Sequence, residues 1–150
     1  MSVSASITWT IQKKGDKISW MEIIQLLLEN GWSLNDHGEM AYLPLHDNGM
    51  YNWQRESINE AKLVKTLIEK ENAKELLGVC ITWKDTNIGG SLLTLSDEEV
   101  LFSININRKT IQICESDLMT DVNWYLVKIN SILSQKEDIT VTSTKFIEFV

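Results

Sequence analysis

Residues 79–115 read VCITWKDTNIGGSLLTLSDEEVLFSININRKTIQICE. Short apolar segments alternate here with turns that contain Asp, Asn or Gly, which is the pattern of successive strands. The predicted strands are Val79–Trp83, Leu92–Leu95, Val100–Ile106 and Thr110–Cys114. Gly89 and Gly90 are predicted to form a hairpin turn between the first two. Because connections this short join antiparallel neighbours, we expect a β-meander over about 79–115.

Two helices are predicted on the N-terminal side of this region from capping signals and apolar spacing. The first begins after Ser19, which forms a capping box with Glu22, and it ends at Gly31. A second capping box, Ser57 with Glu60, predicts the start of the next helix. The predicted apolar face of this second helix comprises Ala61, Val64, Leu67 and Ile68.

A third helix is predicted over about 121–134, and further strands are predicted elsewhere. Residues 7–12 and 139–150 alternate apolar and polar side chains, as half-buried strands do. The apolar run 40–45 contains the chain's single proline, which cannot donate to a β-ladder, so we expect an edge strand or its end. This order predicts a single α+β domain over residues 1–150, with three helices packed on one face of a mostly antiparallel sheet.

The composition argues against several classes of function. The chain has 14 Lys and Arg against 21 Asp and Glu, a net charge of −7. A field of this sign repels phosphate backbones and anionic lipids, so we expect no nucleic-acid partner and no membrane partner. No apolar run approaches the roughly 18 residues of a transmembrane helix, and the N-terminus lacks the basic and apolar regions of a secretory signal. We therefore expect a cytoplasmic protein.

The acidic residues concentrate in two segments. Residues 29–60 hold six acids against one base, and residues 97–121 hold six against two. The two segments carry net charges of −5 and −4, which leaves the rest of the chain at +2. This asymmetry predicts an acidic binding face, although polar loops alone would also produce it. The candidate acids are Asp36, Glu39, Asp47, Asp97, Glu98 and Glu99.

Aromatic residues in the same region are candidate anchors for a partner. Tyr51 and Trp53 lie in the long segment between the first two predicted helices, and Tyr and Trp are the residues that most often anchor protein interfaces. A second interpretation of Trp53 is that it covers the edge of the core. Cys80 and Cys114 each lie in an apolar run, which predicts buried, reduced and unpaired thiols.

Catalytic signals are weak. His37 and His46 lie near three carboxylates, and such groups can bind a divalent metal or relay protons. Their spacing matches no metal-site pattern, and the sequence contains no nucleophile elbow and no phosphate-binding glycine loop. We therefore predict no catalytic residue, no metal and no cofactor, and expect that the chain is not an enzyme. The alternative is a small enzyme or ligand-binding domain that uses the His37/His46 loop.

Three short stretches carry a resemblance to a class of bacterial proteins: Gly31–Asn35, Tyr42–Asp47 and Tyr51–Trp53. With the acidic charge and the size of the chain, they resemble the small immunity proteins of contact-dependent inhibition and other polymorphic toxin systems. The resemblance implies tight stoichiometric binding of a cognate toxin, often a nuclease, that presents a basic surface. It assigns no individual residue a role.

Overall fold

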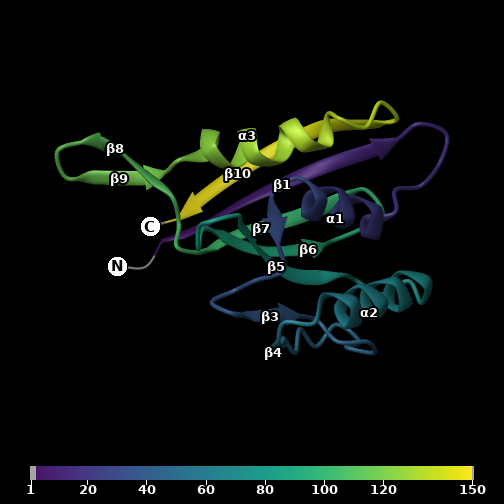
Figure 1. Ribbon diagram of the computed structural model, residues 1–150. Coiled ribbons are helices and arrows are strands. Elements are labelled where there is room, and N and C mark those ends of the chain that lie inside the picture. The colour runs from purple at the N-terminus through teal and green to yellow at the C-terminus, as the bar shows by residue number, and fades with distance from the viewer. Residues whose placement is uncertain (1–2, 150) are drawn as a thin grey trace.

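The computed structural model describes residues 3–149, which form one large antiparallel sheet, a separate hairpin and three helices (Figure 1). The large sheet has the strand order β10-β1-β7-β6-β5-β3-β4, and β2 pairs with β5 beside this path. Its strands are β1 (Ser4–Lys13), β2 (Trp32–Ser33), β3 (Glu39–Tyr42), β4 (Gln54–Ser57), β5 (Gly78–Trp83), β6 (Gly89–Thr94), β7 (Glu99–Ile106) and β10 (Ile139–Phe149). This confirms the predicted α+β class.

The predicted meander is confirmed for three of its four strands. β5, β6 and β7 are consecutive antiparallel neighbours. The prediction for the fourth strand is wrong, because β8 (Thr110–Cys114) pairs instead with β9 (Asp117–Thr120) in a two-stranded sheet. The reason is that β1 pairs along β7, with Ser6 opposite Ser103, and so occupies the edge that a fourth meander strand would need.

The three helices, α1 (Trp20–Glu29), α2 (Glu60–Asn72) and α3 (Val122–Leu133), share one hydrophobic core with the sheet. Alternate residues of β1, such as Trp9, contribute to this core, while the residues between them point to the other face. Phe102 of β7 is fully buried and lies with Trp32 and Tyr125 in an aromatic cluster. The prediction that the helices pack on one face is therefore confirmed.

The helix boundaries follow the predicted signals at α1 but not at α2. Ser19 Oγ accepts a hydrogen bond from the Glu22 backbone N–H, and Gly31 adopts φ +115° just after the helix, as a C′ glycine does. The prediction that Ser57 caps the second helix is wrong. Ser57 is the last residue of β4, and Asn59 caps α2 by accepting from the Lys62 backbone N–H.

Two predictions about strands also need correction. The 40–45 run is not an edge strand, because β3 lies between β5 and β4, and the edge is formed by β4, which the sequence did not predict. Gly89 and Gly90 do not form a turn but begin β6 and are buried. Neighbouring backbone approaches both residues closely, which only glycine permits there.

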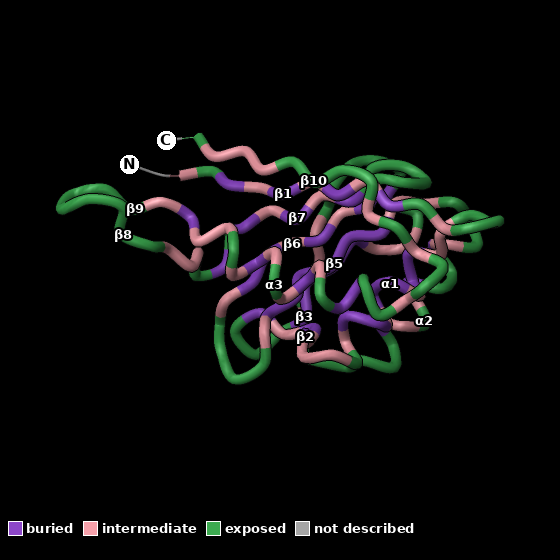
Figure 2. The backbone as a smooth tube through the Cα atoms, turned by 90° about the horizontal axis from the view of Figure 1, so that it is seen from above, coloured by how far each residue is buried: buried purple, intermediate pink, exposed green. Residues whose placement is uncertain are grey.

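Buried residues follow the inner strands and the inner faces of the helices, whereas the connecting loops and the β8–β9 hairpin are largely exposed (Figure 2). Among residues 3–149, no helix is long and apolar enough to cross a membrane.

Candidate binding surface

Asp36 and Glu39 belong to an ion cluster at the start of β3. Asp36 is 7% exposed, and its carboxylate accepts from Arg55 Nη1 at 2.7 Å and lies 2.6 Å from His37 Nδ1. Arg55 Nε also lies 3.5 Å from Glu39 Oε1. Burial raises the pKa of Asp36, but hydrogen bonds with Arg55 and His37 outweigh this effect and hold the pKa below its ordinary value. Asp36 is thus already paired within the chain, while Glu39 is exposed.

Asp47 shapes the loop that follows β3. Its carboxylate is buried and accepts hydrogen bonds from the backbone N–H groups of Tyr51 at 2.8 Å and Asn52 at 2.9 Å. The loop folded around it exposes 77% of Met50 and 50% of Tyr51. Tyr51 is therefore half-exposed, its backbone is held by Asp47, and its role in binding a partner stays a prediction. Met50 was not among the predicted site residues.

Trp53 belongs to a small apolar cluster that is separate from the main core. It is half-buried and packs against Ala41, Cys80 and Ile106, on the face of the sheet opposite the helices. A side chain at Gly78 would approach the Trp53 ring to 3.1 Å. Trp53 therefore covers this second cluster with part of its side chain, and its role as a partner anchor stays a prediction.

Asp97, Glu98 and Glu99 are all exposed where β6 turns into β7. Ser96 Oγ accepts from the backbone N–H groups of Glu98 and Glu99 and so holds this turn. Lys17 lies 3.7 Å from Asp97, and both side chains are about four-fifths exposed. The turn keeps a net negative charge, because three carboxylates face this one ammonium.

The structure brings two of the predicted regions together. A cavity of about 230 Å³ lies beside Asp47 and Tyr51, and another of about 580 Å³ lies beside Asp97. Residues 74–76, which connect α2 to β5, line both cavities. We call this region, from Met50 and Tyr51 across residues 74–76 to Asp97, the loop surface. Asp36 and Glu39 line neither cavity.

An ion pair between the buried Lys70 and the largely buried Glu75 lies under the loop surface. Lys70 is 1% exposed, and its ammonium donates to the Pro44 carbonyl at 2.7 Å and to Glu75 Oε1 at 3.3 Å. Glu75 Oε1 also accepts from the His46 backbone N–H at 2.8 Å. Sequence reasoning missed this network because charged residues on an amphipathic helix are normally expected on the solvent side.

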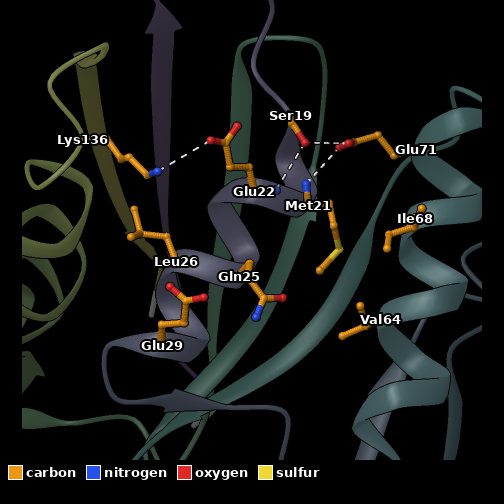
Figure 3. A pocket seen from close by; sticks show the side chains of 10 residues that line it. All are labelled: Ser19, Met21, Glu22, Gln25, Leu26, Glu29, Val64, Ile68, Glu71 and Lys136. Carbon is orange, nitrogen blue, oxygen red and sulfur yellow. Dashed lines mark hydrogen bonds and ion pairs between the residues drawn. The ribbon is translucent and has the colours of Figure 1, made fainter.

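A groove of about 410 Å³ lies between α1 and α2 (Figure 3). Ser19 and Glu71 line this groove and also the 580 Å³ cavity beside Asp97. The apolar lining of the groove comprises Met21, Leu26, Val64 and Ile68. Ile68 is 44% exposed and Ala61 is exposed, so the predicted apolar face of α2 is only partly correct. Leu63, Leu67 and Lys70 are the buried residues of that helix.

Carboxylates border this groove. Glu22 points toward Lys136, 3.7 Å away, and Glu71 reaches from α2 to the start of α1 (Figure 3). Glu71 accepts from Ser19 Oγ at 2.6 Å and from the Met21 backbone N–H at 2.9 Å, so it joins the two helices. Glu29, at the end of α1, is exposed.

The two histidines do not share a site. His37 lies beside Asp36 before β3 begins, and His46 lies 3.5 Å from Glu75 beyond the end of that strand. Within the described part of the chain, no group of three His, Cys, Asp or Glu side chains is placed to hold a metal ion. Comparison of the chain with known proteins finds no matching family, no similar curated protein and no similar solved structure.

The two cysteines differ, and the prediction that both are buried is wrong for Cys114. Cys114 is exposed near the end of β8, where its apolar neighbours have left the main sheet. Cys80 is buried, and burial together with the Asp36 carboxylate raises the pKa of its thiol to about 11.

We expect one fast-reacting thiol in the native protein. Since the thiolate is the reactive form, Cys80 should resist a thiol reagent at pH 8 while Cys114 reacts. Titration with a chromogenic disulfide should give one equivalent rapidly and a second only after unfolding, and Cys114→Ser should remove the fast phase. Rapid reaction of two equivalents in the folded protein would contradict this assignment.

Proposed function

We propose that this chain is an immunity protein, which neutralises a cognate toxin by tight stoichiometric binding. The observation that carries the proposal is the loop surface, where exposed Tyr51 lies across residues 74–76 from the exposed acid Asp97. Exposed Met50 precedes Tyr51 in the chain and lines a further cavity with it. Large apolar anchors beside exposed charge are the components of a protein-binding site.

Exposed Lys17 and Lys74 also line the cavities of the loop surface, so the excess negative charge of the surface lies at the 97–99 turn, and the charge of that turn supports a basic partner. The acids of the 97–99 turn give the approaching protein a field that accelerates encounter, and burial of Met50 and Tyr51 then slows dissociation. A toxin that cleaves nucleic acid needs a basic cleft for phosphates, so it matches the sign of this field. The cytoplasmic location expected for the chain is part of the same proposal, since that is where such a toxin would act.

The direct test uses the neighbouring gene. The protein encoded immediately upstream of this chain should arrest growth when its C-terminal domain is produced alone, and co-production of this chain should restore growth. The two purified proteins should form a one-to-one complex by light scattering. A neighbour that is not toxic, or that does not bind this chain, would contradict the proposal.

Changes to the loop surface should separate binding from folding. Tyr51 has φ +53°, a conformation that Asn tolerates, so Tyr51→Asn combined with Met50→Ser removes both anchors with little backbone strain. We expect about 2 kcal/mol weaker binding and an unchanged melting temperature. Val127→Ser, at a half-exposed position of α3, is the matched control and should bind normally. Equal affinity for the anchor variant and the control would exclude the loop surface.

A further inference from the structure

The β8–β9 hairpin, residues 110–120, is an arm that projects from the body of the protein (Figures 1 and 2). It is unusually apolar for an exposed element: Ile111 is 44% exposed, Ile113 58% and Leu118 62%. An isolated two-stranded hairpin is at best marginally stable in water. Exposed apolar residues on such an element indicate an interaction site.

The apolar side chains of the arm lie on both of its faces. Ile111 pairs with Met119, and Gln112 pairs with Leu118 in the next register position. Because successive residues of a strand point to opposite sides, Ile111 and Leu118 emerge from opposite faces of the ribbon. A flat partner surface would cover only one of them. A cleft that receives the arm would cover both.

The base of the arm is held firmly by the body. Arg108 Nη1 donates to Thr120 Oγ1 at 3.0 Å and lies 3.3 Å from Glu148 Oε1 on β10, which also accepts from the Thr120 backbone N–H at 3.0 Å. On the other side, the Lys109 backbone N–H donates to the Tyr125 hydroxyl of α3 at 2.8 Å. A fixed base presents the arm in one orientation, which reduces the entropy lost on binding.

The charge of the arm indicates which kind of partner would bind it. Glu115 and Asp117 lie at its tip and are exposed, and residues 110–120 contain no Lys or Arg. Two arms would repel each other through these carboxylates, which disfavours a second copy of this chain as the occupant. Lys or Arg side chains at the far end of a cleft would instead complement the tip.

We infer that the arm inserts into a cleft of a protein partner, with apolar walls that receive Ile111, Ile113 and Leu118 and a basic floor that receives Glu115 and Asp117. The inference rests on the proposed function, which supplies the partner. The arm follows the end of β7 at Ile106, whereas the 97–99 turn precedes its start at Glu99, so a toxin that binds both the arm and the loop surface must extend along the sheet. The carboxylates at the tip of the arm then occupy the basic cleft in place of the phosphates that it ordinarily binds.

The experiment compares arm variants against the purified toxin domain encoded upstream. Ile113→Ser with Leu118→Ser should raise the Kd at least about tenfold, mainly through faster dissociation. Glu115→Lys with Asp117→Lys should lower the association rate at low salt by about tenfold and reduce its salt dependence. The controls are Val127→Ser for apolar loss and Glu137→Lys with Asp138→Lys for an equal reversal of charge, all at exposed positions outside the arm.

The possible outcomes distinguish failure of the inference about the arm from failure of the proposed function. If the unaltered chain binds and the arm variants bind equally well while keeping the native melting temperature, the inference is overturned and the proposed function stands. If the unaltered chain does not bind the toxin domain, the proposed function and the occupant inferred from it both fail. If the unaltered chain is a dimer that Ile113→Ser with Leu118→Ser dissociates, the arm binds a second copy, which also overturns the inference.

Discussion

Gly90→Ala is expected to lower the free energy of unfolding by about 4 kcal/mol, which is a large part of the stability of an ordinary domain. A Cβ atom at Gly90 would lie 1.9 Å from the Ser103 carbonyl oxygen of β7. Relief of this overlap requires β6 and β7 to separate where the register between them shifts, so the central pairing of the sheet is lost. Urea unfolding followed by circular dichroism measures the effect.

Gly15→Asn is the control for this substitution. Gly15 is exposed and has φ +76°. No neighbouring atom lies within 4 Å of the place that a Cβ atom would take there. Asn accepts this backbone conformation, so the expected loss is below about 1 kcal/mol. Similar stability of the two variants would show that β6 and β7 do not approach each other closely at Gly90.

Glu75→Gln is expected to destabilise the protein by about 3 kcal/mol. The substitution leaves the buried Lys70 ammonium with the Pro44 carbonyl as a partner but without the carboxylate that neutralises it. Removing one member of a buried ion pair is costly because the other charge stays desolvated. The Gln amide oxygen can still accept from the His46 backbone N–H, so the loop that presents Tyr51 should keep this hydrogen bond. Chemical denaturation measures the loss of stability, and unchanged amide exchange at His46 checks the loop.

Two further variants make this prediction specific. Lys70→Met with Glu75→Gln removes the unpaired charge and should recover most of the lost stability. Glu22→Gln removes ion pairs with Lys13 and Lys136 that are partly open to solvent, so it should cost less than about 1 kcal/mol. Equal losses for Glu75→Gln and Glu22→Gln would mean that the Lys70 pair has no special role.

The sequence predicted some residues of the candidate binding surface and not others, depending on how far along the chain their partners lie. The sequence identified Tyr51 and the 97–99 acids as candidates because loop position, residue type and charge are local properties. It could not show that Asp36 is used within the chain, because Arg55 is 19 residues away and reaches it only after the loops fold. The contact of Asp47 with the Tyr51 backbone is local, and the sequence analysis did not predict it. Ile68 was expected to be buried on the apolar face of α2, but it is 44% exposed in the groove between α1 and α2.

Local signals along the chain were enough to establish the α+β class, the three helices, the cap at Ser19 and the three central strands β5, β6 and β7. These features depend on side-chain periodicity and on contacts within a few residues, which the linear order of the chain contains. Long-range packing determines that β1 lies between β10 and β7, that β8 therefore leaves the sheet as an arm, and that Lys70 is buried. Each of these outcomes is set by backbone and charged groups far apart in the sequence, whose hydrogen bonds are satisfied only when the whole sheet has formed.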